Sequence, residues 1–375
     1  MRDKIKVGIT GQNGFVGKHL FNTLGLARES FEVIDFEKEY FSDERSLDSF
    51  VSSCDVIVHL AAMNRHESEQ FIYETNVGLV DSLIAALKRT NSTPHVLISS
   101  STQEERGNLY GKSKKEGREA LIAWAEEFGG KVTGLLIPNV YGSFGRPFYN
   151  SFIATFCHQL THGEQPTISN DGQVNLIYVQ ELVEDIIKVI NKKEHQPHYI
   201  VEARDVKNVS EVLGLLQNFK TLYLERGEIP ILKNNFELNL FNTFRSYMDH
   251  ASIYPRKFQL HTDPRGTFVE IIRMGIGGQS SYSTTVPGIT RGNHFHTRKI
   301  ERFAVIQGKA LIQLRKMDSN EVMDFYLDGK EPSYVDMPIW FTHNIKNIGK
   351  EELITMFWIN EPYDPSDPDT YFLEV

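Results

Sequence analysis

Three histidines and one glutamate near the end of the chain have side chains that bind transition metals. His294 and His296 are two residues apart, so both point to the same face of an extended strand. Glu301 would reach that face from the next strand, and a motif resemblance at residues 338–347 adds His343 as a third imidazole. Three imidazoles and a carboxylate suit zinc, iron, nickel or manganese, and ligand type alone does not separate these metals. The sequence therefore predicts a metal site at His294, His296, Glu301 and His343.

A second group of polar residues has the spacing that reduction of a carbonyl requires. A carbonyl that receives a hydride at carbon must receive a proton at oxygen, and the Tyr110 hydroxyl can supply it. Lys114 lies four residues further on, one helical turn away, where its charge would lower the pKa of the tyrosine. Ser101, at the end of an expected strand, would hydrogen-bond the substrate oxygen. Each residue is ordinary by itself, but together Ser101, Tyr110 and Lys114 are predicted to be catalytic.

The first expected strand leads straight into a glycine-rich turn. Residues 11–17 read Gly-Gln-Asn-Gly-Phe-Val-Gly and follow an apolar run at residues 5–10. The tight turn, the approach of backbone to phosphate and the close packing of the next helix each need glycine, so this turn predicts a dinucleotide site. Asp35 would accept the adenosine ribose hydroxyls, which suggests NADH. Arg65 and Lys38 would suit the 2′-phosphate of NADPH, so both cofactors stay open.

The elements that must position these residues are of two kinds. In roughly the first 245 residues, short apolar runs alternate with amphipathic stretches, which predicts parallel strands with crossover helices. After Arg256, short alternating runs are broken by Gly, Pro, Asp and Asn, which predicts an all-β part. We therefore expect an α/β domain at residues 1–250 and an all-β domain at residues 251–375.

Composition excludes several classes of protein. Hydrophobic residues make up 40% of the 375, enough for two cores, so a disordered chain is excluded. The net charge of −9 would repel nucleic-acid phosphates. No apolar run approaches the ~20 residues that span a bilayer, and the N-terminus lacks the apolar region of a signal peptide. Cys54 and Cys157 have no zinc or disulfide spacing. We expect a cytoplasmic protein that binds neither nucleic acid nor membrane.

The motifs of the first part resemble those of the extended short-chain dehydrogenase/reductase family. The GxxGxxG spacing, the His-Leu-Ala-Ala segment at 59–62, Asn76 and the YxxxK pair occur in that family's order. The resemblance implies a Rossmann fold and a nicotinamide cofactor. Only eight residues separate Ser101 from Tyr110, which is shorter than usual for the family and implies a shortened pocket wall. The expected cofactor-binding residues are Gly11, Asn13, Gly14, Phe15, Val16, Asp35, Leu60, Ala61, Ala62, Tyr110 and Lys114.

The second part resembles the cupins, whose fold is a jelly roll. Residues 288–308 fit the first cupin motif, G(x)5HxH(x)4E(x)6G, and residues 338–347 resemble the second motif, with Trp340 where glycine is usual. Residues 263–270 resemble the opening of dTDP-4-dehydrorhamnose 3,5-epimerases, which remove a proton beside a keto group, although a plain turn and strand explains them equally well. The base of such a reaction is left unassigned.

The order of the two parts and the tail at residues 363–375 resemble the CapF family of capsular polysaccharide synthesis. That resemblance implies an enzyme whose cupin epimerises carbon 3 of a UDP-2-acetamido-2,6-dideoxy-4-hexulose and whose reductase reduces carbon 4 with NADPH or NADH. The product would lead toward UDP-N-acetyl-L-fucosamine for capsule or O-antigen. It also implies zinc, or another divalent metal, and a homodimer. Two alternatives stay open: a cupin that only holds a structural metal or a dimer, and a nucleotide-sugar dehydratase or 4-epimerase.

Overall fold

The structure is a computed structural model that describes residues 3–258, 260–263, 266–269, 271, 277–361 and 364–375. The chain forms two compact units. The first comprises Met1–Thr155 and Ile168–Val209, and the second comprises Phe156–Thr167 and Ser210–Val375. The division expected between residues 250 and 251 stays a prediction. Across the described residues, none of the helices has the length and apolar character needed to cross a membrane.

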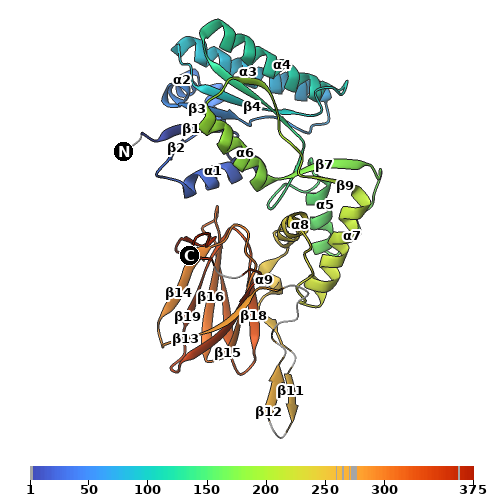
Figure 1. The fold of residues 1–375 in the computed structure, drawn as a ribbon, viewed down its shortest axis with the longest axis vertical. Helices are drawn as coiled ribbons and strands as arrows, with labels where there is room; N and C mark the ends of the chain where they lie inside the picture. The colour runs from blue at the N-terminus through green and yellow to red at the C-terminus, as the bar shows by residue number, and fades with distance from the viewer. Residues whose placement is uncertain (1–2, 259, 264–265, 270, 272–276, 362–363) are drawn as a thin grey trace. The chain divides into compact units, whose positions relative to one another are not determined.

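A six-stranded parallel sheet forms the centre of the first unit (Figure 1). Its strand order is β2-β1-β3-β4-β5-β8. Strand β2 therefore lies on one side of β1, and the later strands, from β3 onward, lie on the other side. The point of reversal, between β1 and β3, is where parallel α/β sheets bind their ligands. The strands are β1 (Ile5–Thr10), β2 (Phe31–Ile34), β3 (Val56–His59), β4 (His95–Ser101), β5 (Lys131–Ile137) and β8 (Gln196–Ile200).

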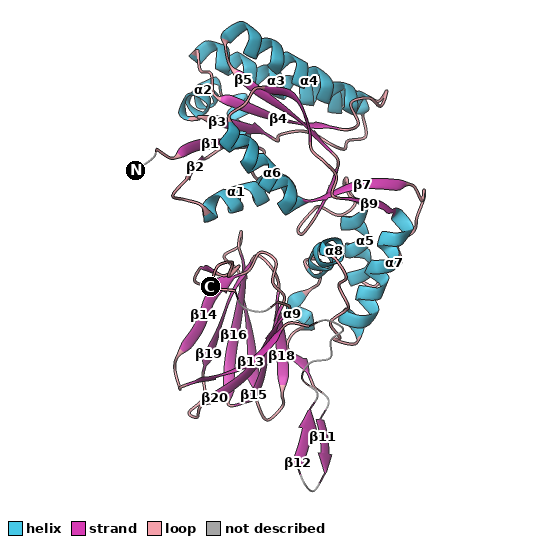
Figure 2. Ribbon diagram, in the orientation of Figure 1, coloured by secondary structure: helices cyan, strands magenta, loops and turns pink. Residues whose placement is uncertain are grey.

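Helices cover both faces of this sheet, because its strands carry apolar side chains in both directions (Figure 2). On β3, Val56 and Val58 join one core cluster and Ile57 joins the other. The first cluster packs under α1 and α6, and the second under α2, α3 and α4. These helices are α1 (Phe15–Leu26), α2 (Glu44–Ser53), α3 (Glu69–Thr90), α4 (Leu109–Phe128) and α6 (Val179–Lys192). This arrangement confirms the Rossmann fold.

Smaller elements complete the first unit. A three-stranded sheet consists of β6 (Asn139–Tyr141), β7 (Gln173–Tyr178) and β9 (Asp205–Asn208), and a short 3-10 helix, η1, spans Lys38–Ser42. Helix α5 (Phe152–Thr161) contributes residues to both units.

Two five-stranded sheets dominate the second unit, with the orders β10-β18-β15-β20-β13 and β17-β16-β19-β14-β21. Every pairing between their described strands is antiparallel, which confirms the all-β architecture expected for this part and is consistent with a cupin-like domain. A separate hairpin joins β11 (Leu260–Asp263) to β12 (Gly266–Val269). The sheet strands are β10 (Arg256–Lys257), β13 (Gln279–Thr285), β14 (Thr290–Phe295), β15 (Glu301–Gln307), β16 (Lys309–Lys316), β17 (Val322–Asp328), β18 (Ser333–Met337), β19 (Phe341–Asn347), β20 (Leu353–Ile359) and β21 (Tyr371–Phe372).

A buried polar network attaches helices to one of these sheets. The Arg302 guanidinium on β15 donates to Asp336 on β18 at 2.8 Å, and Tyr223 donates its hydroxyl to the same carboxylate. Arg245 donates to the Met337 carbonyl at 3.0 Å. Because these buried charges are paired and hydrogen-bonded, the network defines how the helices lie on the sheet. The helical elements of this unit are α7 (Val209–Phe219), the π-helix η2 (Lys220–Glu225), α8 (Asn235–Arg245) and α9 (His250–Ile253).

Candidate active site and metal centre

The glycine-rich turn has the close contacts that the sequence predicts. Gly11 has φ +75°, and a Cβ there would lie 2.8 Å from the Ala61 amide nitrogen. A Cβ on Gly17 would lie 2.3 Å from the Gly11 carbonyl oxygen. Gly14 is the N-cap residue of α1 and has no side chain to cap the helix. The amides of the first helical turn, which include those of Phe15 and Val16, therefore stay available to a ligand, and Asn13 lies in the turn just before them. This is a cradle for an anionic group of a cofactor.

The segment after β3 lies against this turn. The Leu60 amide donates to the Thr10 carbonyl at 3.1 Å, and the Ala61 amide lies 3.4 Å from Thr10 Oγ1. Asn76, the structural asparagine expected from the family resemblance, exchanges two hydrogen bonds with the Met63 backbone. Leu60, Ala61 and Ala62 therefore line the point of sheet reversal beside the glycine turn, and Asp35 follows β2 as an exposed residue at the same edge.

The three expected catalytic residues come from β4 and α4. Ser101 ends β4, and Tyr110 lies in the first turn of α4, which Asn108 caps by accepting the Gly111 amide at 2.7 Å. The Lys114 ammonium donates to the Ser99 carbonyl at 3.0 Å and lies 6.0 Å from the centre of the Tyr110 ring. The strand end and the helix start thus present the residues to one edge of the sheet.

The ionisation of the Tyr110 and Lys114 pair differs from the prediction. Burial raises the pKa of Tyr110 to about 12, and nearby Tyr149 adds to the rise. Burial lowers the pKa of Lys114 to about 8, against a smaller opposing effect of Glu104. The predicted lowering of the tyrosine pKa is wrong for this structure, because loss of water around the hydroxyl raises that pKa.

A cavity of about 230 Å³ opens beside Tyr110. Arg65 lines this cavity and donates to the backbone carbonyls of Phe148 and Tyr149 at 2.6 and 3.2 Å. Asp35 is not among the lining residues and directly follows β2. Sequence reasoning missed the rest of the wall, because its amide, ionisable and apolar residues belong to no recognisable motif. The lining residues are Asn64, Arg65, His66, Glu69, Ile72, Gln103, Asn108, Tyr110 and Asn150.

The four expected metal ligands converge. His294 on β14 pairs in register with His343 on β19, and Glu301 begins β15. The ligand atoms of these residues and His296 all lie within 4.8 Å of one another. Glu301 Oε2 is 2.9 Å from His296 Nε2 and 3.3 Å from His343 Nε2. All three atoms are buried, and among the described residues no group outside this cluster satisfies them. Such a cluster of orphaned lone pairs fits a transition metal.

Electrostatics favour the metal-binding forms of His294 and Glu301, whereas for His296 burial alone would lower the pKa but the Glu301 carboxylate raises it above the usual value of a histidine. Burial, with further contributions from His343 and His296, lowers the pKa of His294 to about 4, so its imidazole is neutral at pH 7. Burial alone would raise the pKa of Glu301, but the adjacent His296 and His343 lower it far below the usual range of a glutamate. A neutral imidazole and an ionised carboxylate are the forms that coordinate metals.

Trp340 keeps the turn that the second cupin motif makes with glycine. Its φ is +61°, in the left-handed region that glycine adopts easily. The ring is buried and stacks on Phe295 with centroids 5.6 Å apart, and the Trp340 amide donates to the His296 carbonyl at 2.8 Å. The substitution therefore preserves the path of the chain beside the metal ligands.

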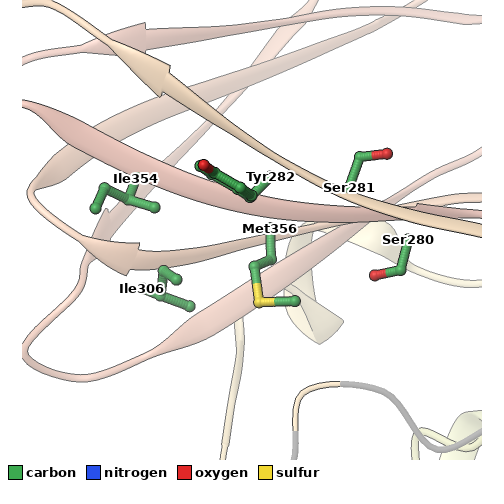
Figure 3. A pocket seen from close by; sticks show the side chains of 6 residues that line it. All are labelled: Ser280, Ser281, Tyr282, Ile306, Ile354 and Met356. Carbon is green, nitrogen blue, oxygen red and sulfur yellow. The ribbon is translucent and has the colours of Figure 1, made fainter.

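Two further regions, residues 263–270 and a second cavity, provide no described residue of the candidate sites. Within the stretch at residues 263–270, Pro264, Arg265 and Glu270 lie outside the described residues, so a substrate role there stays a prediction. A cavity of about 330 Å³ on the second unit is lined by side chains of β13, β15 and β20 (Figure 3). None of the metal-ligand candidates lines it. The residues that do are Ser280, Ser281, Tyr282, Ile306, Ile354 and Met356.

Two family models match the chain. Residues 7–201 match the NAD dependent epimerase/dehydratase family, and residues 261–371 match the polysaccharide biosynthesis C-terminal domain. The chain is 33% identical to UDP-2-acetamido-2,6-beta-L-arabino-hexul-4-ose reductase from Pseudomonas aeruginosa, over 99% of each chain.

The chain is also similar to solved structures. The capsular polysaccharide assembling protein CapF from Staphylococcus aureus shares 34% identity and a TM-score of 0.62, over 99% of this chain and 100% of that one. RMD from Pseudomonas aeruginosa, solved with NADPH, shares 20% identity and a TM-score of 0.52 over 58% of this chain and 83% of its own. The second likeness concerns the fold alone.

Proposed function

Because the chain belongs to the NAD dependent epimerase/dehydratase family, among its CapF-like nucleotide-sugar reductases, we propose that it reduces carbon 4 of a UDP-2-acetamido-2,6-dideoxy-4-hexulose. The observation that carries the proposal is the polar cavity beside Tyr110, at the sheet edge where the glycine turn also lies. The reductase from Pseudomonas aeruginosa, named for a UDP-linked 2-acetamido hexulose, supports this class of substrate.

The residues divide the chemistry of reduction between them. A bound nicotinamide would supply the hydride that adds to carbon 4. Tyr110 donates the proton to the carbonyl oxygen, so its elevated pKa suits a group that must hold that proton until the hydride arrives. The Lys114 ammonium stabilises the tyrosinate that results, and Ser101 hydrogen-bonds the reacting oxygen. Solvent then returns a proton to Tyr110.

The glycine turn fits the pyrophosphate of either nicotinamide cofactor. Asp35 is an exposed residue after β2, where a carboxylate accepts ribose hydroxyls and disfavours a 2′-phosphate. Lys38 lies nearby along the chain, at the start of η1, and offers a positive charge for that phosphate. We keep NADPH as the proposed cofactor, with NADH as the alternative to be compared in the same assay.

For the cupin we propose epimerisation at carbon 3 of the same 4-keto sugar, before reduction. The ketone makes the hydrogen on carbon 3 acidic, and a bound zinc or other divalent ion would supply charge that stabilises an enolate. His294, His296, Glu301 and His343 would hold the ion. The product would lead toward UDP-N-acetyl-L-fucosamine, and the working form would be a homodimer.

One observation favours the rival in which the cupin metal is only structural. The cluster offers four protein ligands, and His296, Glu301 and His343 are all buried. Structural zinc sites are closed by four protein ligands, whereas catalytic sites leave a position open for water or substrate. His294 is the partly exposed member, so it is the ligand beside which an open position would lie.

A single assay tests both halves. The full chain is incubated with UDP-4-keto sugars and NADPH or NADH in deuterated water, while absorbance reports cofactor oxidation and mass spectrometry reports deuterium on carbon 3. Tyr110→Phe should abolish oxidation and leave exchange, whereas His296→Ala should abolish exchange with the dimer intact. Exchange that survives His296→Ala while dimerisation is lost would leave the cupin a structural role. Absence of net cofactor oxidation with every sugar would instead indicate a dehydratase or 4-epimerase.

A further inference from the structure

The carboxylate of Asp369 is buried in the C-terminal tail and surrounded by hydrogen-bond donors. Its Oδ1 accepts from the Thr297 amide at 3.0 Å and from the Thr297 hydroxyl at 2.6 Å. Its Oδ2 accepts from the amides of Arg298 and Lys299, both at 3.0 Å. Asp369 is only 2% exposed. One side chain therefore binds three consecutive amides of the turn that follows His296.

The backbone of the same residue contacts a candidate metal ligand directly. The Asp369 carbonyl oxygen lies 2.5 Å from His296 Nδ1. A carbonyl can only accept, so this contact places the ring proton on Nδ1 and leaves the Nε2 lone pair for coordination. That Nε2 atom faces Glu301 Oε2 at 2.9 Å. The tail thus selects the tautomer in which His296 can coordinate a metal.

Other contacts hold the tail in this place. The Lys299 ammonium donates to the Pro368 carbonyl at 2.6 Å, and the Leu373 amide donates to the Asn293 carbonyl at 2.9 Å. Phe372 of β21 pairs in register with His294 of β14. The tail therefore contacts the segments that carry both histidines of the first cupin motif, although it lies some 70 residues further along the chain.

We propose that Asp369 is a positioning residue of the metal centre, which it serves by fixing the 297–299 turn and orienting His296 through its own carbonyl. The inference rests on the proposed metal binding. Groups that orient metal ligands in this way change affinity by roughly 10–100-fold when they are altered. The tail is then part of the site.

Asp369→Asn tests the role with a side chain of nearly the same shape. One of its two polar atoms is an NH2 group, which cannot accept, so either the Thr297 donors or the amides of Arg298 and Lys299 lose their acceptor. Asp364→Asn is the matched control, because Asp364 lies in the same tail and its side chain bonds the Ser366 amide and hydroxyl.

Zinc affinity of the full chain is measured by competition with a chromophoric chelator. Cobalt is then loaded in place of zinc, and its visible spectrum reports ligand geometry. Melting is followed with zinc and with chelator. We expect Asp369→Asn to bind zinc about 10–100-fold more weakly, to change the cobalt spectrum and to lose much of the melting shift that zinc produces. Asp364→Asn should match the parent chain in all three.

Equal affinity and an unchanged cobalt spectrum in Asp369→Asn would overturn the inference, even if the variant melted at a lower temperature with and without zinc alike. If that variant does not fold, Thr297→Val removes the hydroxyl donor alone, and unaltered zinc affinity there would overturn it. A parent chain that binds neither zinc nor cobalt would end the metal proposal itself, and the inference with it. The reductase assignment is tested separately by cofactor oxidation.

Discussion

The side chains of Glu104 and Arg118 form a buried two-point ion pair in the first unit, with contacts of 2.8 Å from Nε to Oε1 and 2.7 Å from Nη2 to Oε2. Both side chains are at most 3% exposed. Glu104 also accepts from the Ser100 hydroxyl. Because Glu104 follows Ser101 by three residues and Arg118 lies on α4, one turn beyond Lys114, the pair anchors the short loop between β4 and α4 to that helix.

Arg118→Met should lower the free energy of unfolding by about 3–5 kcal/mol, because it leaves the Glu104 carboxylate buried and unpaired. Arg89→Met is the control: its pair with Asp48 also involves two guanidinium nitrogens, with one contact at 2.7 Å, but the arginine is 35% exposed, so solvent screens the pair and its loss should cost far less than that of Arg118. Urea unfolding of the full chain measures both. The double variant Glu104→Leu with Arg118→Met should be more stable than Arg118→Met alone, and the opposite order would refute this account of the pair.

The sequence predicted the features that depend on near neighbours. Tyr110 and Lys114 share one helix, and His294 and His296 share one strand end, so periodicity alone places each pair on one face. Partners that lie far apart along the chain were missed. Asp369 and Thr297 are 72 residues apart, and no local pattern shows which acid meets which amide. The predicted direction of the Tyr110 pKa shift was wrong for a related reason. The burial that raises this pKa depends on the whole unit, whereas sequence spacing shows only the nearest charged residue.

Gly17→Ala should weaken cofactor binding and destabilise the chain. The added Cβ would lie 2.3 Å from the Gly11 carbonyl oxygen, so the turn that faces the pyrophosphate must shift. Gly25→Ala lies on the same helix with no atom within 4 Å of the added Cβ, and it should stabilise the chain by up to about 1 kcal/mol. Calorimetric titration with NADPH and with NADH measures affinity. Equal affinity in the two variants would refute the role of the turn.

Lys114→Met should make the chain more stable at neutral pH while abolishing reduction. Burial lowers the pKa of Lys114 from 10.5 to about 8, so between these values the unfolded state binds more protons and stability rises with pH. Below pH 8 the folded chain bears the full penalty of about 3 kcal/mol for the buried charge. Loss of the hydrogen bond to the Ser99 carbonyl offsets about 1 kcal/mol of the gain.

The pH dependence separates this effect from simple packing. Urea unfolding at pH 7 and at pH 10 should show the advantage of Lys114→Met shrinking as pH rises, because the native lysine becomes neutral. A constant difference between the two chains across that range would mean that the charge of Lys114 is not the cause.

Trp340 combines a backbone conformation that favours glycine with a side chain that fills a core. Its φ of +61° costs a residue with a Cβ roughly 1–2 kcal/mol, whereas its buried ring is worth about 3–5 kcal/mol. Both Trp340→Gly and Trp340→Ala lose the ring, so both should be destabilised. Glycine alone escapes the cost of the left-handed conformation, and the glycine variant should therefore be the more stable of the two by about 1 kcal/mol.

In an unstrained position alanine is the more stable residue, so the sign of the difference between the two variants in urea unfolding shows whether the left-handed conformation matters. An alanine variant as stable as the glycine variant would mean that Phe295 stacking, and not φ, accounts for how the chain accepts tryptophan at this turn.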